Sequence, residues 1–468
     1  SGKTFKRIGA SNVHVDHHDL WINPKNTNHL VLGNDGGVNI SYDQGNNWIK
    51  LNQPSVGQFY SINVDNSNPY NVYGGLQDNG VWMAKNNSIE SPSWYETGHN
   101  NWTKIMGGDG MQIQIDNRDN NIVYTGLQFG NYYRLDLFNN ERKSIKPKHK
   151  LGDSPLRFNW QTPILISPHN QDIIYFGSNK LHRSFNKGDD WGEISKDLTS
   201  GGKKGNVPYG TITSFDESNF QFGKLIVGSD DGFVSISNDS GKTWKSVSDN
   251  LPPDLWVSRV IFSKHEKNTI YLSLNGYRYN DFKPYIYVSN DNGDSWENIS
   301  SNLPLSPVNV IREDINRKEI LYVGTDNGLF ISFNSGKKWH PFESSLNRVA
   351  VHDLVIQNEK NDLLVGTHGR SIYKTNLDLF NDFMIEKNGE KPLIIFEIND
   401  LRHSNSWGKR SNYSDDVFKS SVKTIVYSDK SIIYDYTITD NFNNILNKGK
   451  LNLDKGCLLY TSDAADEV

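Results

Sequence analysis

Four side chains that bind metals or carry protons lie within five residues near the start of the chain: His14, Asp16, His17 and His18. Imidazole and carboxylate groups are ligands that suit zinc, iron or manganese, so the segment is a candidate metal site. If it is extended, alternation of side chains places His14, Asp16 and His18 on one side and His17 on the other. The plainer alternative is a hydrogen-bonded polar network, and a contact with a sugar or a peptide is a third.

Three aspartates, Asp35, Asp78 and Asp109, are candidates for a catalytic carboxylate. Hydrolysis of a glycosidic bond needs two carboxyl groups, about 5 to 5.5 Å apart for retention or about 6.5 to 9.5 Å for inversion of the sugar configuration. Asp35 and Asp78 stand before Gly36 and Gly80, where capping of a turn would also account for them. Asp109 lies between glycines and has no such plain explanation.

The elements that must position these residues are marked by a repeated pattern, S-x-D-x-G-x-x-W, in which Asn replaces Asp in two copies. The Asp or Asn oxygen accepts backbone N–H groups of its own turn, and the glycine supplies a positive φ. The Trp covers the turn with a large apolar face. The five copies are 41–48, 184–191, 237–244, 289–296 and 332–339.

This pattern resembles the Asp box, or bacterial neuraminidase repeat, of sialidases, sortilin-type receptors and xyloglucanase-type glycosidases. The resemblance implies a β-hairpin that serves folding and says nothing direct about chemistry. A sialidase would also need three arginines with a Tyr–Glu pair, and no such set can be assembled here.

A second pattern, a β run that ends in glycine before a polar turn, recurs at intervals of about 40 to 50 residues, which is the period of propeller blades with four strands each. The repeated position falls at Gly33, Gly74, Gly126, Gly177, Gly228, Ser273, Gly324 and Gly366. We therefore expect an all-β protein in which residues 1–376 form a β-propeller of seven or eight four-stranded blades. Either the last unit belongs to another ring, or the strand Thr4–Ile8 closes its blade.

Residues 1–5 match residues 240–244, so we expect the chain to begin within an Asp box and upstream repeats to be missing. Residues 377–391 are expected to be a linker, and β runs within 392–456 indicate a truncated immunoglobulin-like β-sandwich. Residues 457–468 resemble a translated sequencing adaptor. Without them the chain has no cysteine, which excludes a disulfide framework or a thiolate site.

Composition excludes several classes of partner. The 468 residues include 49 basic and 54 acidic side chains without a basic run, which gives no support to nucleic acid or an anionic membrane. No apolar run is long enough to span a bilayer. No cofactor is expected, although a metal held by His14, Asp16 and His18 is open.

In a four-stranded blade the turns between strands two and three share one face of the ring with the crossovers between blades. We expect the ligand-binding residues to gather there, with Trp160 and Tyr60 as stacking platforms for a sugar. The candidates are His14, Asp16, His17, His18, Gln58, Tyr60, Gln77, Asn79, Trp160, His368 and Arg370. Arg259 and Arg370 are suited to a ligand carboxylate.

The segments 14–18, 33–37, 57–60, 73–80, 107–110 and 366–371 are similar to those of bacterial sortilin-like repeat proteins, often labelled glycosyl hydrolases. The resemblance implies a secreted, periplasmic or cell-envelope protein with a C-terminal immunoglobulin-like domain. We expect a propeller that binds a glycan or a protein segment on the face described above, at blades one to three. The alternative is a xyloglucanase-like glycoside hydrolase whose second carboxylate lies in the missing upstream propeller.

Overall fold

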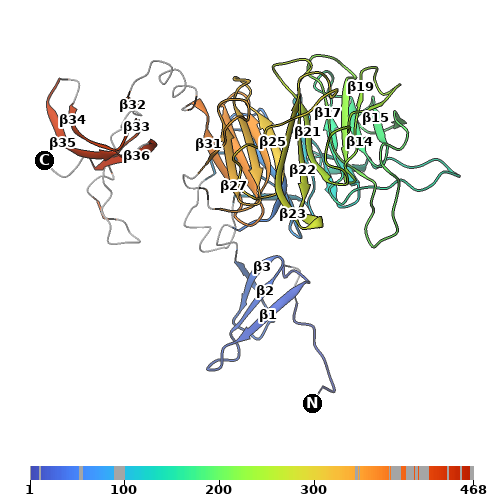
Figure 1. Cartoon of the computed structure of the whole chain (residues 1–468). Coiled ribbons are helices and arrows are strands. Elements are labelled where there is room, and N and C mark those ends of the chain that lie inside the picture. The colour runs from blue at the N-terminus through green and yellow to red at the C-terminus, as the bar shows by residue number, and fades with distance from the viewer. Residues whose placement is uncertain are drawn as a thin grey trace. The chain divides into compact units, whose positions relative to one another are not determined.

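A computed structural model describes residues 2–9, 12–51, 56–88, 101–342, 346, 348–378, 380, 392–396, 405, 409–410, 421–428, 430–439, 442–453 and 456–463. The chain divides into two compact units, Ser1–Thr375 and Asn376–Val468. Most of the expected linker 377–391 lies outside the described residues, as do all of the last residues, 464–468. Figure 1 shows a structure built mainly of strands, and a short 3-10 helix lies at Tyr277–Tyr279.

Eight antiparallel sheets follow one another along the first unit, each built from consecutive strands, which confirms the all-β propeller class. The first four sheets are β1–β4 (His17–Ile22, Leu30–Asn34, Gly37–Ser41, Ile49–Leu51), β5–β8 (Phe59–Val64, Asn71–Leu76, Gly80–Lys85, Thr103–Met106), β9–β12 (Gln114–Ile115, Ile122–Leu127, Asn131–Asp136, Glu141–Ser144) and β13–β16 (Ile164–Ile166, Ile174–Gly177, Leu181–Ser184, Gly192–Glu193).

The last four sheets of the unit continue the same order, and the final one has three strands. They are β17–β20 (Ile212–Glu217, Leu225–Ser229, Val234–Ser237, Lys245–Ser246), β21–β24 (Trp256–Phe262, Ile270–Gly276, Asp281–Ser289, Glu297–Asn298), β25–β28 (Val308–Glu313, Leu321–Thr325, Gly328–Ser332, His340–Pro341) and β29–β31 (Val351–Gln357, Asp362–Thr367, Ile372–Asn376).

Seven of these sheets, from β5–β8 to β29–β31, close into a ring. Its closing contact joins the first and last of the seven: Gln58 and His368 form a β-bridge, and the Tyr70 hydroxyl donates a hydrogen bond to Asp362 at 2.7 Å. Phe59, Ile62 and Leu364 pack in one apolar cluster across the same junction. The ring therefore has seven blades and closes without a strand from residues 4–8.

The sheet β1–β4, called the first sheet below, lies outside this ring. Every residue of β1 is exposed, including Trp21 at 48 %. Its buried apolar cluster has four members: Val13, Leu30, Leu32 and Trp48. One of our expectations was that the last repeat belongs to another ring. In the structure the last repeat is part of the ring, and the first repeat lies outside it.

Each Asp box holds its own turn and also fixes the blade before it. In the box at 237–244 the Ser237 hydroxyl accepts the Gly241 N–H at 2.9 Å, and Asp239 accepts the Thr243 N–H at 2.9 Å. The Trp244 indole N–H donates to the carbonyl oxygen of Ile194 in the preceding blade at 2.9 Å. A methyl group at Gly241 would lie 2.8 Å from Ile194 Cβ, so close approach as well as φ requires glycine.

The same bond from the box Trp to a preceding carbonyl occurs in all five boxes. The other pairs are Trp48 with Ile8, Trp191 with Ile145, Trp296 with Val247 and Trp339 with Ile299. The role of the Trp is therefore wider than the turn cover that we expected, because it joins neighbouring sheets.

One carboxylate near the ring axis ties four blades together. Asp353 on β29 is 3 % exposed and accepts hydrogen bonds from the Ser61 hydroxyl at 2.8 Å and the Ile62 N–H at 3.1 Å, both on β5. It also accepts from Arg259 on β21 at 3.0 Å and from Arg312 on β25 at 3.1 Å. Burial and the nearby Arg259 charge lower the pKa of Arg312 to about 10.

The C-terminal unit contains the three-stranded sheet β32–β33–β36 and the hairpin β34–β35. Four of its strands agree with the runs expected from sequence: β32 (Leu393–Ile395), β33 (Ser421–Ser428), β34 (Ile432–Thr439) and β35 (Ile445–Leu453). β36 (Gly456–Asp463) pairs with β33 and includes most of the residues that resemble an adaptor. The immunoglobulin-like sandwich and the adaptor origin both remain predictions.

The ring is predicted to depend on Asp353 for its stability. The variant Asp353→Ala leaves Arg259 and Arg312 without their shared carboxylate. Breaking such a buried charge network costs about 3 to 5 kcal/mol of unfolding free energy, measured by urea unfolding.

The matched control is Asp294→Ala, which removes an exposed pair with Lys245 and is expected to cost less than about 1 kcal/mol. Equal losses in the two variants would contradict the role of Asp353. If Asp353→Ala does not fold, Ser61→Ala removes one hydrogen bond to the same carboxylate and should cost about 1 kcal/mol.

Candidate functional site

A bulge at one position of the innermost strand decides which side chains face the ring axis. In five ring blades the register between the first two strands shifts by one residue, which leaves one residue of the inner strand unpaired. Such bulges redirect a side chain and are common beside functional sites. The unpaired residues are Tyr60, Thr213, Ser258, Asn309 and His352, and all five line a single cavity.

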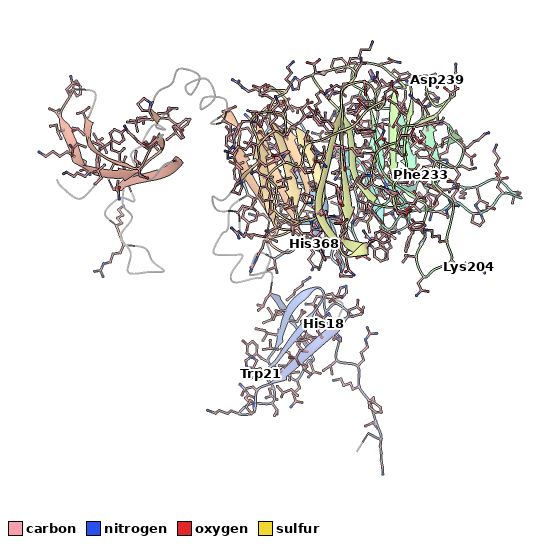
Figure 2. The ribbon with its side chains drawn as sticks, in the orientation of Figure 1. His18, Trp21, Lys204, Phe233, Asp239 and His368 are labelled. Atoms are coloured by element: carbon pink, nitrogen blue, oxygen red, sulfur yellow. The ribbon has the colours of Figure 1, made fainter. Side chains whose placement is uncertain are left out.

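This cavity, called the mouth cavity below, has a volume of about 510 Å³ and is lined by five of the seven ring blades and by crossovers between them. The turns between second and third strands contribute Gln77, Asp326 and His368. The crossovers contribute Trp160 and Gln161. Figure 2 shows His368 near one face of the ring and Asp239 of an Asp box at the other. Turns and crossovers thus meet on the face that the blade topology predicted.

Three rings stack along one wall of the mouth cavity. His352 and His368 lie 4.3 Å apart at an angle of 12°, and Tyr60 stacks on His368 at 5.5 Å. Burial lowers the pKa of His352 to about 3, with a smaller contribution from His368, and burial also lowers the pKa of His368. Burial raises the pKa of Tyr60 to about 12. All three rings are therefore neutral at pH 7.

In contrast to these neutral rings, two arginines bring positive charge and hydrogen-bond donors to the mouth cavity. The Arg278 guanidinium lies 4.0 Å above the Trp256 ring and 4.8 Å from the Tyr277 ring, and forms no ion pair with any described carboxylate. Arg259 Nε and His368 Nδ1 are buried without a hydrogen-bond partner among the described residues. Both atoms are enclosed by protein, whereas Arg278 is exposed at the cavity and can take acceptor groups of a ligand.

Carboxylates are scarce in the mouth cavity. Of the described residues that line it, Asp326 alone carries a carboxyl group, which accepts a hydrogen bond from Asn309 at 2.8 Å. Asp109, a predicted catalytic residue, is 9 % exposed and accepts the Asp78 N–H at 2.8 Å and the Gln128 amide at 3.0 Å. It holds the β6–β7 turn against the next blade.

The other two predicted carboxylates, Asp35 and Asp78, lie beside the first sheet. Asp35 pairs with His18, whose place on β1 matches that of the bulged residues in the ring. Asp78 lies in the β6–β7 turn, where burial, and next the charges of Asp109 and Asp35, raise its pKa. The Asn79 side chain donates to the Asp35 carbonyl at 3.1 Å, which joins this turn to the first sheet.

The remaining predicted residues divide between the cavity and its surroundings. Gln77, Tyr60, Trp160 and His368 line the mouth cavity, and Trp160 is 36 % exposed. His14 and Asp16 lie near Asp78, while His17 is exposed on β1. Gln58 and Arg370 are exposed beside the bridge that closes the ring.

Sequence reasoning missed His352, Tyr277 and Arg278. His352 lies in the inner strand of the last blade and belongs to the bulge position, which the alignment of Tyr60 with the later repeats could have indicated. Tyr277 and Arg278 lie on the short 3-10 helix inserted between β22 and β23, and their aromatic and basic types in an insertion are the only signal.

Comparison with known proteins finds partial similarities. The family model described as "Sortilin, neurotensin receptor 3" matches residues 284–463. The vacuolar protein sorting/targeting protein PEP1 of two Saccharomyces cerevisiae strains, RM11-1a and AWRI1631, is 31 % identical over 99 residues, which is 21 % of this chain and 5 % of the yeast protein. The chain thus spans a small part of these relatives.

Among solved structures, YCF48 from Cyanidioschyzon merolae superimposes with a TM-score of 0.39 at 13 % identity, over 80 % of this chain and 98 % of that one. A chain of the mitotic checkpoint complex gives a TM-score of 0.45 at 14 % identity, over 69 % and 90 % of the two chains. Within the described residues, no helix has the length and apolar character needed to cross a bilayer.

The neutral histidine pair predicts a pH dependence. The pKa of His352 is about 3 in the folded protein against about 6.5 when unfolded, so the unfolded chain binds more protons between these values. Its contribution to stability is complete above pH 6.5 and is lost progressively as the pH falls toward 3. Between pH 7.5 and 5.5 the loss from one such histidine is about 1 kcal/mol.

The measurement is urea unfolding of the wild type and of His352→Phe at pH 7.5, 6.5 and 5.5. The variant should lose less stability over this range than the wild type. Asp216, whose pKa burial raises to about 6, is present in both proteins and cancels in the difference. Parallel pH profiles would show that His352 is protonated in the folded ring.

Proposed function

We propose that this propeller is a binding module whose mouth cavity holds a protein segment rich in carbonyl and carboxylate groups. The observation that carries the proposal is Arg278: this exposed guanidinium, without an ion pair among the described residues, lines a cavity with one carboxyl group. A peptide backbone and an acidic side chain supply the acceptors that this arginine lacks.

Shape and aromatic content support the same ligand. A cavity of about 510 Å³ can take several residues of a peptide rather than a folded domain. Trp160, Trp256 and Tyr277 offer flat apolar faces next to the polar donors. Because five blades line the cavity and the Asp353 network joins four blades of the ring, the surface is preformed, which lowers the entropic cost of binding.

The names of the partly similar proteins agree with a protein ligand. The matching family is named for a receptor, and the yeast relatives for protein sorting. We include a secreted or cell-envelope location in the proposal. Glycan binding has no separate support, and the glycoside hydrolase alternative gains none from a cavity with a single carboxyl group.

The test is selection of peptides from a displayed random library on the full chain, followed by fluorescence anisotropy with the selected peptides. Arg278→Gln removes the stacked cation, and Trp160→Ala removes an aromatic face. Each is expected to weaken binding by about tenfold or more, as loss of a charged contact or an aromatic anchor does. Peptides selected should contain acidic residues.

The matched control is Arg142→Gln, which removes an arginine that also stacks on an aromatic ring, Tyr133, but on an outer strand. This variant should bind the selected peptides with the same affinity as the wild type. Equal weakening by Arg142→Gln would place the peptide elsewhere. Release of reducing ends from a polysaccharide, abolished by Asp35→Asn, Asp78→Asn or Asp109→Asn, would replace the proposal by the hydrolase.

A further inference from the structure

Four carboxylates gather where the first sheet meets the β6–β7 turn: Asp16, Asp35, Asp78 and Asp109. Burial, and next the negative charges of Asp109 and Asp35, raise the pKa of Asp78. Among the described residues no Lys or Arg forms an ion pair with any of the four, and the imidazoles of His14 and His18 are their neighbours. This concentration of negative charge calls for a cation.

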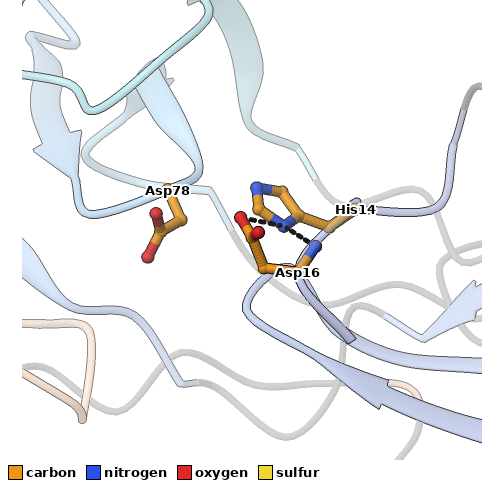
Figure 3. Close-up of side chains that lie close together, drawn as sticks. All are labelled: His14, Asp16 and Asp78. Atoms are coloured by element: carbon orange, nitrogen blue, oxygen red, sulfur yellow. Dashed lines mark hydrogen bonds and ion pairs between the residues drawn. The ribbon is translucent and has the colours of Figure 1, made fainter. Parts of the chain in front are cut away.

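His14, Asp16 and Asp78 have the geometry of an open metal site. One ligand atom from each lies within 4.8 Å of the others. Figure 3 shows His14 and Asp16 on one segment and Asp78 facing them from the β6–β7 turn. Ligand atoms around a tetrahedral zinc ion lie about 3.3 Å apart, so the side chains must draw closer together to bind it.

The contacts of His14 leave a ring nitrogen suited to a metal. Nδ1 lies 3.6 Å from the Asp16 carboxylate, which is too long for a hydrogen bond, and accepts the Asp16 N–H at 3.3 Å, a long contact that a metal ion at this nitrogen would replace. The ring is also held in place from behind, because a methyl group at Gly36 would lie 2.8 Å from His14 Cβ. His18, in the same segment, pairs with Asp35 instead.

We propose that His14, Asp16 and Asp78 bind one first-row transition-metal ion of the zinc type, which links the segment before β1 to the ring. One imidazole and two carboxylates suit such an ion, whereas calcium prefers six to eight oxygen ligands. The ligand set differs from the sequence-based trio of His14, Asp16 and His18, since Asp78 takes the place of His18.

The experiment measures zinc binding to the full chain, after chelator treatment, by equilibrium dialysis. The wild type should bind one Zn²⁺ in the strongest class of sites. His14→Ala, Asp16→Asn and Asp78→Asn should each lower the affinity at least tenfold. Asp16 is exposed, so Asp16→Asn keeps the test valid if another variant fails to fold.

The matched controls are His17→Ala and Asp19→Asn, which change the same residue types in the same segment outside the proposed site. Both should bind zinc like the wild type. Equal affinity in the wild type and the three ligand variants, or a wild type without bound zinc at millimolar concentration, would overturn the proposal. Tighter binding of Ca²⁺ than of Zn²⁺ would overturn the assignment to a transition metal.

Hydrogen–deuterium exchange then tests the link itself. With zinc, amide exchange should slow both in residues 12–22 and in residues 71–85, because the ligands come from both segments. The effect should vanish in Asp78→Asn. Protection confined to residues 12–22 would mean that the ion is held without Asp78, which contradicts the link.

Discussion

The carboxylate of Asp353 is the constraint on which the ring depends. It meets two arginines and the opening strand of the ring, so strands from four sheets share one buried charge. Arg259 also lines the mouth cavity. The same residue thus serves the closure of the ring and the binding surface.

The bulge on the inner strand is the second element that makes the site. Side chains of a strand alternate between faces, so an extra residue changes the direction of one side chain and restores the pattern beyond it. The residues on either side, such as Phe59 and Ser61, keep their places in the packing while Tyr60 is released toward the cavity.

Much of the fold could be predicted from the sequence, because the Asp boxes and the glycine period report local turns. Which sheets belong to the ring could not be predicted, since the first sheet carries the same motifs as the ring sheets and differs only in what packs against it. The face of the site was predictable from blade topology. The role of Asp109 in holding the β6–β7 turn depended on contacts between two adjacent blades, and the stacking of His352 on His368 depended on how one blade folds, and neither is encoded in a local sequence pattern.

The bond from each box Trp to the blade before it ends on a main-chain oxygen and not on a side chain. A main-chain oxygen is present whatever the residue, and the series Ile8, Ile145, Ile194, Val247 and Ile299 shows that a β-branched side chain beside the box glycine is the common companion. Neighbouring repeats therefore need little mutual adjustment. Over evolutionary time a blade can be copied, lost or exchanged as a unit, and its axial residues can then diverge toward a new ligand.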